Sequence, residues 1–113
     1  MSDVDKKETA RPEEGYPLPD ASLETLIRSL VTQVQLALLS FEGENGKHEP
    51  DLRVARHYID MLAMLQEKTR GNLTLEEQRL LENSLTELRF RYVQTAEEMK
   101  KAGTAAASES AQA

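Results

Sequence analysis

Glycine and proline interrupt the middle of this chain at only two places, and this spacing constrains the fold more than any other feature. The first interruption is GENGKHEP at residues 43–50, and the second is RGN at residues 70–72. Turns are expected at both, because glycine and proline break regular elements. The segments that flank these turns carry apolar residues at a helical period. The sequence therefore predicts an all-α domain of three helices, over about 22–41, 51–70 and 74–101.

The first predicted helix follows YPLPDAS, where Asp20 or Ser22 can accept hydrogen bonds from the free N–H groups of the first turn. Projected at 100° per residue, its apolar residues fill an arc of about 140°. They are Leu23, Leu26, Ile27, Leu30, Val31, Val34, Ala37, Leu38 and Phe41. Leu36 and Leu39 lie outside this arc.

The second predicted helix begins behind Pro50, with Asp51 as its N-cap. Its apolar arc is about 200° wide and centred on Leu62, so we expect it to be the most buried helix. Gly71 is expected to take the left-handed conformation that ends it. Lys68 and Arg70 fall in its last turn, where cations favour the helix dipole. A role for these two cations in contacting an acidic partner stays open.

The third predicted helix has the clearest start, because Thr74 and Glu77 match the capping-box pattern S/T-x-x-E. Its apolar seam has coiled-coil spacing and consists of Leu81, Leu85, Leu88, Tyr92 and Met99. The short connection before it predicts that the second and third helices form an antiparallel hairpin. No strand is expected: Asn45-Gly46 could form a β-hairpin turn, but it joins two segments of helical period.

Both ends of the chain are expected to be disordered tails. Residues 1–15 are charged with few apolar side chains, and residues 102–113 are a low-complexity Ala/Ser stretch. Next to the first tail, Tyr16-Pro17-Leu18-Pro19 favours an extended strap that packs Tyr16 and Leu18 on the helices. The alternative is a ligand for an aromatic groove on another protein.

Composition excludes several classes of function. The chain has 113 residues, no cysteine and a net charge of -6. Disulfides and thiol chemistry are therefore excluded, and neither nucleic acid nor an anionic membrane is an expected partner. No signal peptide and no membrane span are recognisable, so a cytoplasmic location is expected.

No catalytic residues, cofactor or metal site are predicted, because phosphate-loop, dinucleotide and paired His/Glu motifs are all missing. His57, Met61 and Met64 share one helix face and could bind a soft cation, although methionines at such spacing more often fill a core. His57 and Asp60 could form a general base and its carboxylate, but Asp60 can pair equally well with Arg56. A small-molecule or metal-binding module near His57 and the second turn is therefore the alternative function.

The leading expectation is a non-enzymatic module for protein–protein contact, because three helices of this size cannot hide all the apolar residues present. A homo-oligomer is expected, with a two-fold dimer favoured, and docking to an unidentified second protein is left open. The residues proposed for the interface are Leu36, Leu39, Met61, Met64, Phe90 and Val93.

Three strings carry a family resemblance: YPLPDASLETLI, ARHYIDMLAMLQEKTRGNLT and LLENSLTELRFRYV. Over about Tyr16–Val93 the chain resembles a bacterial family known as domain of unknown function 1844. One departure is Leu75, where the pattern has proline after Thr74, and the first helical position tolerates either residue. The resemblance implies a compact helical cytoplasmic domain with variable tails, and it supplies no activity or site residues.

Overall fold

The computed structural model describes residues 15–44 and 46–112, with side-chain surroundings up to residue 103. Its elements are the helix α2 (Leu23–Leu38), the strands β1 (Phe41–Gly43) and β2 (Gly46–His48), and the helices α3 (Leu52–Lys68) and α4 (Leu75–Gln112). The prediction of a small all-α domain is confirmed, with one short strand pair added to it.

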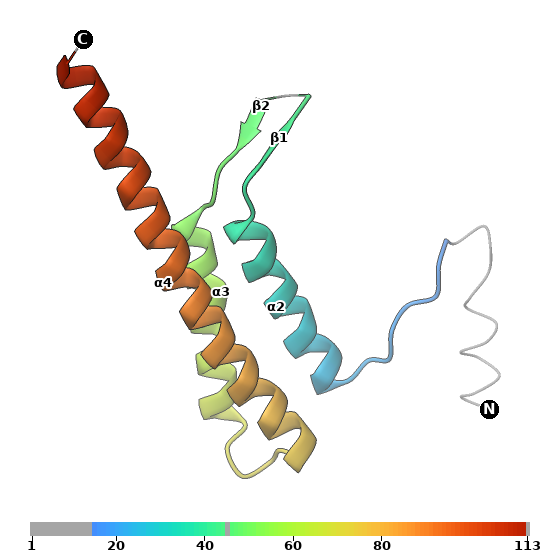
Figure 1. Cartoon of the computed structure of the whole chain (residues 1–113). Helices are drawn as coiled ribbons and strands as arrows, with labels where there is room; N and C mark the ends of the chain where they lie inside the picture. The colour runs from blue at the N-terminus through green and yellow to red at the C-terminus, as the bar shows by residue number, and fades with distance from the viewer. Residues whose placement is uncertain (1–14, 45, 113) are drawn as a thin grey trace.

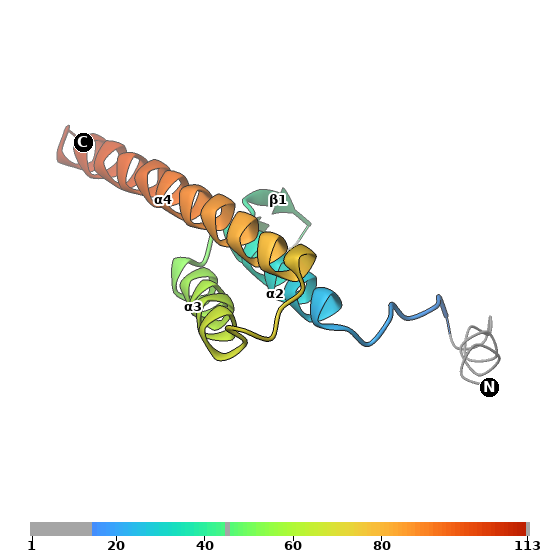
Figure 2. The same cartoon turned by 90° about the horizontal axis from the view of Figure 1, so that it is seen from below.

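The three helices run side by side with alternating directions (Figure 1). Seen along the bundle, they sit at the corners of a triangle, and each packs on the other two (Figure 2). The α4 helix has 38 residues and is about 57 Å long, whereas α3 has 17 residues and is about 25 Å long. The C-terminal part of α4 therefore projects beyond α2 and α3.

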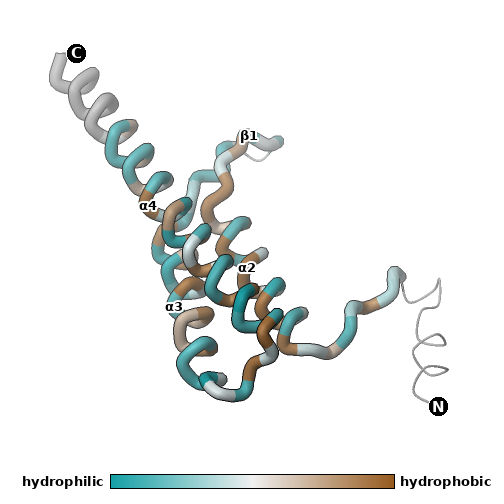
Figure 3. The backbone as a smooth tube through the Cα atoms, turned by 60° about the horizontal axis from the view of Figure 1, so that its bottom comes forward, coloured by the Kyte–Doolittle hydropathy of each residue, from teal (hydrophilic) through white to brown (hydrophobic). Residues whose placement is uncertain are grey.

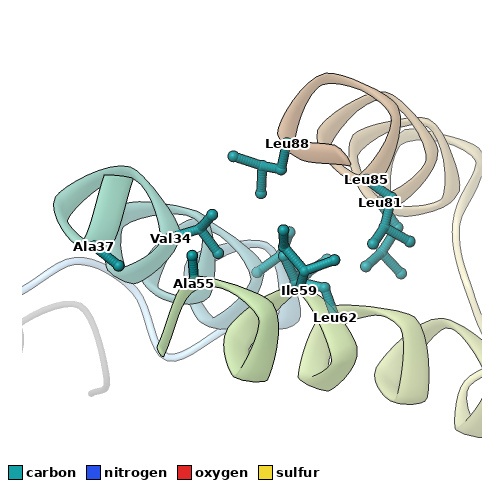
Figure 4. Close-up of a cluster of buried hydrophobic side chains, with 9 residues drawn as sticks. Val34, Ala37, Ala55, Ile59, Leu62, Leu81, Leu85 and Leu88 are labelled. Atoms are coloured by element: carbon teal, nitrogen blue, oxygen red, sulfur yellow. The ribbon is translucent and has the colours of Figure 1, made fainter. Parts of the chain in front are cut away.

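The core consists of nine buried apolar side chains, and each helix contributes three of them (Figure 4). They are Ile27, Val34, Ala37, Ala55, Ile59, Leu62, Leu81, Leu85 and Leu88. The second helix was expected to be the most buried, and α3 has no more fully buried residues than α2 or α4. In a triangular bundle each helix turns one stripe inwards, and of the broad apolar arc of α3 only the edges at Val54 and Met64 are exposed among the described residues.

The first helix ends three residues earlier than expected, at Leu38, and the loop after it forms an antiparallel strand pair. Phe41 faces His48 across the pair, and their rings stack with centroids 4.9 Å apart. Phe41 continues the helical period of α2, but this local aromatic contact holds it in a strand instead. The backbone N–H of Asp51 then donates to the carbonyl of Ala37 at 2.7 Å, which ties the start of α3 to the end of α2.

The α3 helix begins after Asp51, whose carboxylate accepts from the Val54 N–H at 3.1 Å, and it ends at Lys68 with Thr69 as the C-cap. Gly71 therefore does not cap the helix. The N–H of Asn72 donates to the carbonyl of Thr69 at 2.8 Å, and Gly71 has φ +85°. This is the pattern of a type II β-turn, in which the third residue needs a positive φ.

The α4 helix begins with a reciprocal capping box. The Glu77 N–H donates to the Thr74 hydroxyl at 3.1 Å, and the Thr74 N–H donates to the Glu77 carboxylate at 2.8 Å. The helix continues to Gln112, through the Ala/Ser-rich stretch expected to be disordered from residue 102. Alanine has the highest helix propensity, and adding residues to an existing helix needs no new nucleus.

The segment before α2 does not form the expected strap. Tyr16 and Leu18 are 89% and 88% exposed, and the chain here runs away from the helices (Figure 1). The expectation that these side chains pack on the bundle is therefore wrong. The tail expected at residues 1–15 lies, except for Gly15, outside the described residues.

Candidate functional site

The structure places the six expected interface residues on the outer sides of three different helices. Leu36, Met64 and Phe90 each stand two positions after a fully buried residue, at Val34, Leu62 and Leu88. Two positions on a helix correspond to a rotation of about 200°, so these side chains point away from the core.

Because the three helices surround one core, side chains on their outer sides point in three different directions. The apolar stretches are accordingly spread over all three helices (Figure 3). Leu39 lies just after α2, Met61 is half-buried on α3, and Val93 lies on α4. The six residues therefore do not form one continuous surface.

On α4, Phe90 stands beside Val93, and Val93 lines a groove. Phe90 is 67% exposed and Val93 is 58% exposed. A groove of about 210 Å³ between α3 and α4 begins at Val93. Its lining residues are Arg56, Ile59, Asp60, Arg89, Tyr92 and Val93. Apolar surface therefore runs from Phe90 across Val93 towards buried Ile59 and half-buried Tyr92.

Two arginines border this groove, one from each helix. Arg56 forms a 4.0 Å ion pair with Asp60, one helical turn further along α3. Arg89 on α4 forms no hydrogen bond or ion pair with the residues that the structure describes. The groove thus joins an apolar interior to a charged edge, at which Asp60 is paired with Arg56 and the guanidinium of Arg89 could lie over an aromatic ring.

The sequence did not identify this groove, although it pointed to Val93 and Phe90. Arg56, Ile59 and Arg89 come from two helices, and neither helix alone shows that they meet. Arg56 was expected as a possible partner of Asp60, and the structure pairs them; Ile59 is buried in the core. Only the packing of α3 against α4 makes a groove from them.

Two other grooves lie at the ends of the bundle. One, of about 360 Å³, lies at the turn between α3 and α4, and its lining residues are Gln66, Arg70, Gly71, Leu73, Gln78 and Glu82. Arg70 donates to the Glu67 carboxylate at 2.7 Å, so this cation has a local structural partner. The other, of about 540 Å³, lies between the base of the strand pair and the projecting part of α4.

His57, the centre of the alternative prediction, lines none of these grooves. It is exposed on α3, and its ring meets the edge of Tyr58 at a centroid distance of 5.2 Å. Within residues 15–44 and 46–103, no three His, Asp or Glu side chains gather closely enough to hold a metal ion.

In the part of the chain that the structure describes, no helix is both long enough and apolar enough to cross a membrane. Residues 20–94 match the model of the family described as Domain of unknown function (DUF1844). The chain belongs to this family. No curated protein and no solved structure matches it. The DUF1844 match spans α2, the strand pair, α3 and the bundled part of α4, so it includes Phe90, Val93 and the groove beside them.

Proposed function

We propose that this chain is a non-enzymatic protein–protein interaction module that acts by self-association. The observation that carries the proposal is the apolar surface that continues from Phe90 and Val93 into the groove between α3 and α4. Exposed apolar surface of this kind usually marks a contact with another protein.

The nature of the core supports the same proposal. Every buried side chain in the described part of the chain is apolar. The buried side chains therefore only pack against one another. Every polar or charged side chain of the described residues is at least partly exposed and can take part in a contact with a partner.

The proposed setting is the bacterial cytoplasm, as the family resemblance suggested. A chain without cysteine fits a compartment in which disulfides do not form. The net charge of -6 favours a protein over nucleic acid as the partner.

The test is the mass of the full-length protein in solution, measured by light scattering after size exclusion over a range of micromolar concentrations. The expected result is twice the 12.7 kDa of one chain at the upper end of the range. A mass of one chain throughout would refute self-association. The ionic strength should be varied as well, because an association held mainly by apolar contact changes little with added salt.

A further inference from the structure

We propose that two copies of this chain pair side by side and parallel along α4, with Phe90 of each copy inserted into the α3/α4 groove of the other. This inference rests on the proposed self-association and specifies its surface. It begins from the observation that a protruding aromatic side chain and an apolar groove lie next to each other on one helix.

The groove offers space at the surface for a side chain from another copy. Its volume is about 210 Å³, and it opens to solvent between α3 and α4. Ile59, Tyr92 and Val93 provide apolar contact for the ring. Arg56 and Arg89 border the same space, and a guanidinium group near a ring face adds a cation–π attraction.

Phe90 cannot enter the groove of its own copy. Around α4, Val93 is about 60° from Phe90, and Arg89 is about 100° from it in the same direction. Phe90 thus lies on one side of Val93, and the groove lies on the other side at a similar height along the helix. A second copy has to supply the ring.

This placement decides the direction of the pair. A two-fold axis parallel to α4 places the Phe90 side of one copy against the groove side of the other. It also keeps equivalent residues of the two copies at the same height along the helix. Phe90 of one copy then meets the groove of the other, and the reverse contact forms at the same time, as a two-fold interface requires. An antiparallel pair would place each side of the face against its own counterpart, so Phe90 would meet no groove.

One charged pair agrees with the parallel arrangement. In such a pair, the Phe90 side of one helix lies against the groove side of the other, and Val93 lies between the two sides. Arg79 is on the Phe90 side and Glu82 on the groove side, and both are exposed, so Arg79 of one copy comes near Glu82 of the other. Such a charge pair adds little affinity but favours one register over others.

The length of α4 provides a second argument. Its C-terminal part projects past α2 and α3 (Figures 1 and 2). A single helix without tertiary packing is only marginally stable in water. Parallel pairing keeps the two α4 helices together along this projecting part, whereas antiparallel pairing centred on Phe90 sends the projecting parts in opposite directions.

The absence of cysteine makes a direct test possible, because any disulfide in a single-cysteine variant must join two copies. Val93→Cys and Thr86→Cys should each form a covalent dimer rapidly under mild oxidation of the full-length protein. The two positions are seven residues apart on the same face, and both meet their own counterparts only if the helices are parallel. In an antiparallel pair, only one position along the helix can meet itself.

The matched control is Leu36→Cys, on the outer side of α2, where the native residue is 53% exposed. It should cross-link far more slowly than Val93→Cys. In a second experiment, Phe90→Ala should raise the dissociation constant of the dimer by about tenfold or more, as expected for an aromatic anchor. Leu36→Ala should leave this constant unchanged. Circular dichroism of each variant at low concentration checks that the monomer is still folded.

Each outcome separates this inference from the proposed function. If the unmodified protein is monomeric, both fail. If it is dimeric but Phe90→Ala dimerises as well as the parent, or Thr86→Cys and Val93→Cys cross-link no faster than Leu36→Cys, only the inference about this surface is overturned. Cross-linking at one of the two α4 positions but not the other would overturn the parallel direction.

Discussion

Gly71 offers a clean separation of backbone strain from side-chain packing. It stands in the turn between α3 and α4 with φ +85°, a conformation that side chains disfavour. A Cβ placed on it would meet no atom within 4 Å. Substitution by alanine therefore creates no clash and changes only the cost of the backbone conformation.

The size of the effect follows from two opposing contributions. An L-residue in the left-handed region costs roughly 1–2 kcal/mol relative to its preferred conformations. Alanine also restricts the unfolded chain, which returns about 0.4–1 kcal/mol to the folded state. Gly71→Ala should therefore destabilise the fold by about 1 kcal/mol, and Gly71→Val should destabilise it more, because a β-branched residue fits this region worse.

Gly103 is the matched control within the same chain. A Cβ there would also meet nothing within 4 Å, but this residue lies in α4 and has no positive φ. Gly103→Ala should stabilise the protein slightly, because alanine favours a helix over glycine by about 0.5–1 kcal/mol.

Urea unfolding, followed by far-UV circular dichroism at one fixed protein concentration, measures both variants under the same association equilibrium. The melting temperature of Gly71→Ala should fall by about 4–8 °C. Equal stability of Gly71→Ala and the parent would refute the assignment of this glycine to a type II turn.

Further predictions concern the core and the helix starts. Leu85→Ala should cost about 2–5 kcal/mol in urea unfolding, because Leu85 is 2% exposed and the bundle can close only part of the cavity. Thr74→Ala should cost about 1 kcal/mol, because its hydroxyl accepts from a backbone N–H that has no partner within the helix. In Thr32→Ala the lost hydroxyl donates only to the carbonyl of Arg28 inside a regular helix, so thermal melting should be nearly unchanged. Equal losses in the two threonine variants would contradict the capping argument. Asp51→Ala should resemble Thr74→Ala, since its carboxylate accepts from the Val54 N–H at the start of α3.

Local signals in the sequence were sufficient for most of the helical fold. The capping pattern of Thr74 and Glu77 involves residues three apart, and the inward seam Leu81, Leu85 and Leu88 follows from the helical period alone. Such features are set within one helix, so no knowledge of the other helices is needed to find them.

Features set by competition between two local preferences were less predictable. Phe41 satisfies the helical period of α2 and also fits a strand opposite His48, and the stacked rings favour the strand. The Ala/Ser-rich end of α4 contains no large apolar residue, yet its helix propensity continues a helix that is already formed. In the first case the deciding contact is with His48, across the strand pair, and in the second it is the preceding part of α4. Both lie outside the segment whose own pattern was used for the prediction.

The candidate site shows why surplus apolar residues indicate a partner but not its position. Leu36, Met64 and Phe90 look equivalent in sequence, since each stands two positions after a buried residue and so lies outside its helix's inward stripe. The structure adds what lies next to each of them. Phe90 stands beside Val93, which lines the groove that α3 and α4 form with Ile59 and Arg56. A protruding ring becomes a plausible anchor only when a complementary groove exists at the right height, and that relation belongs to the packing of two helices rather than to either one.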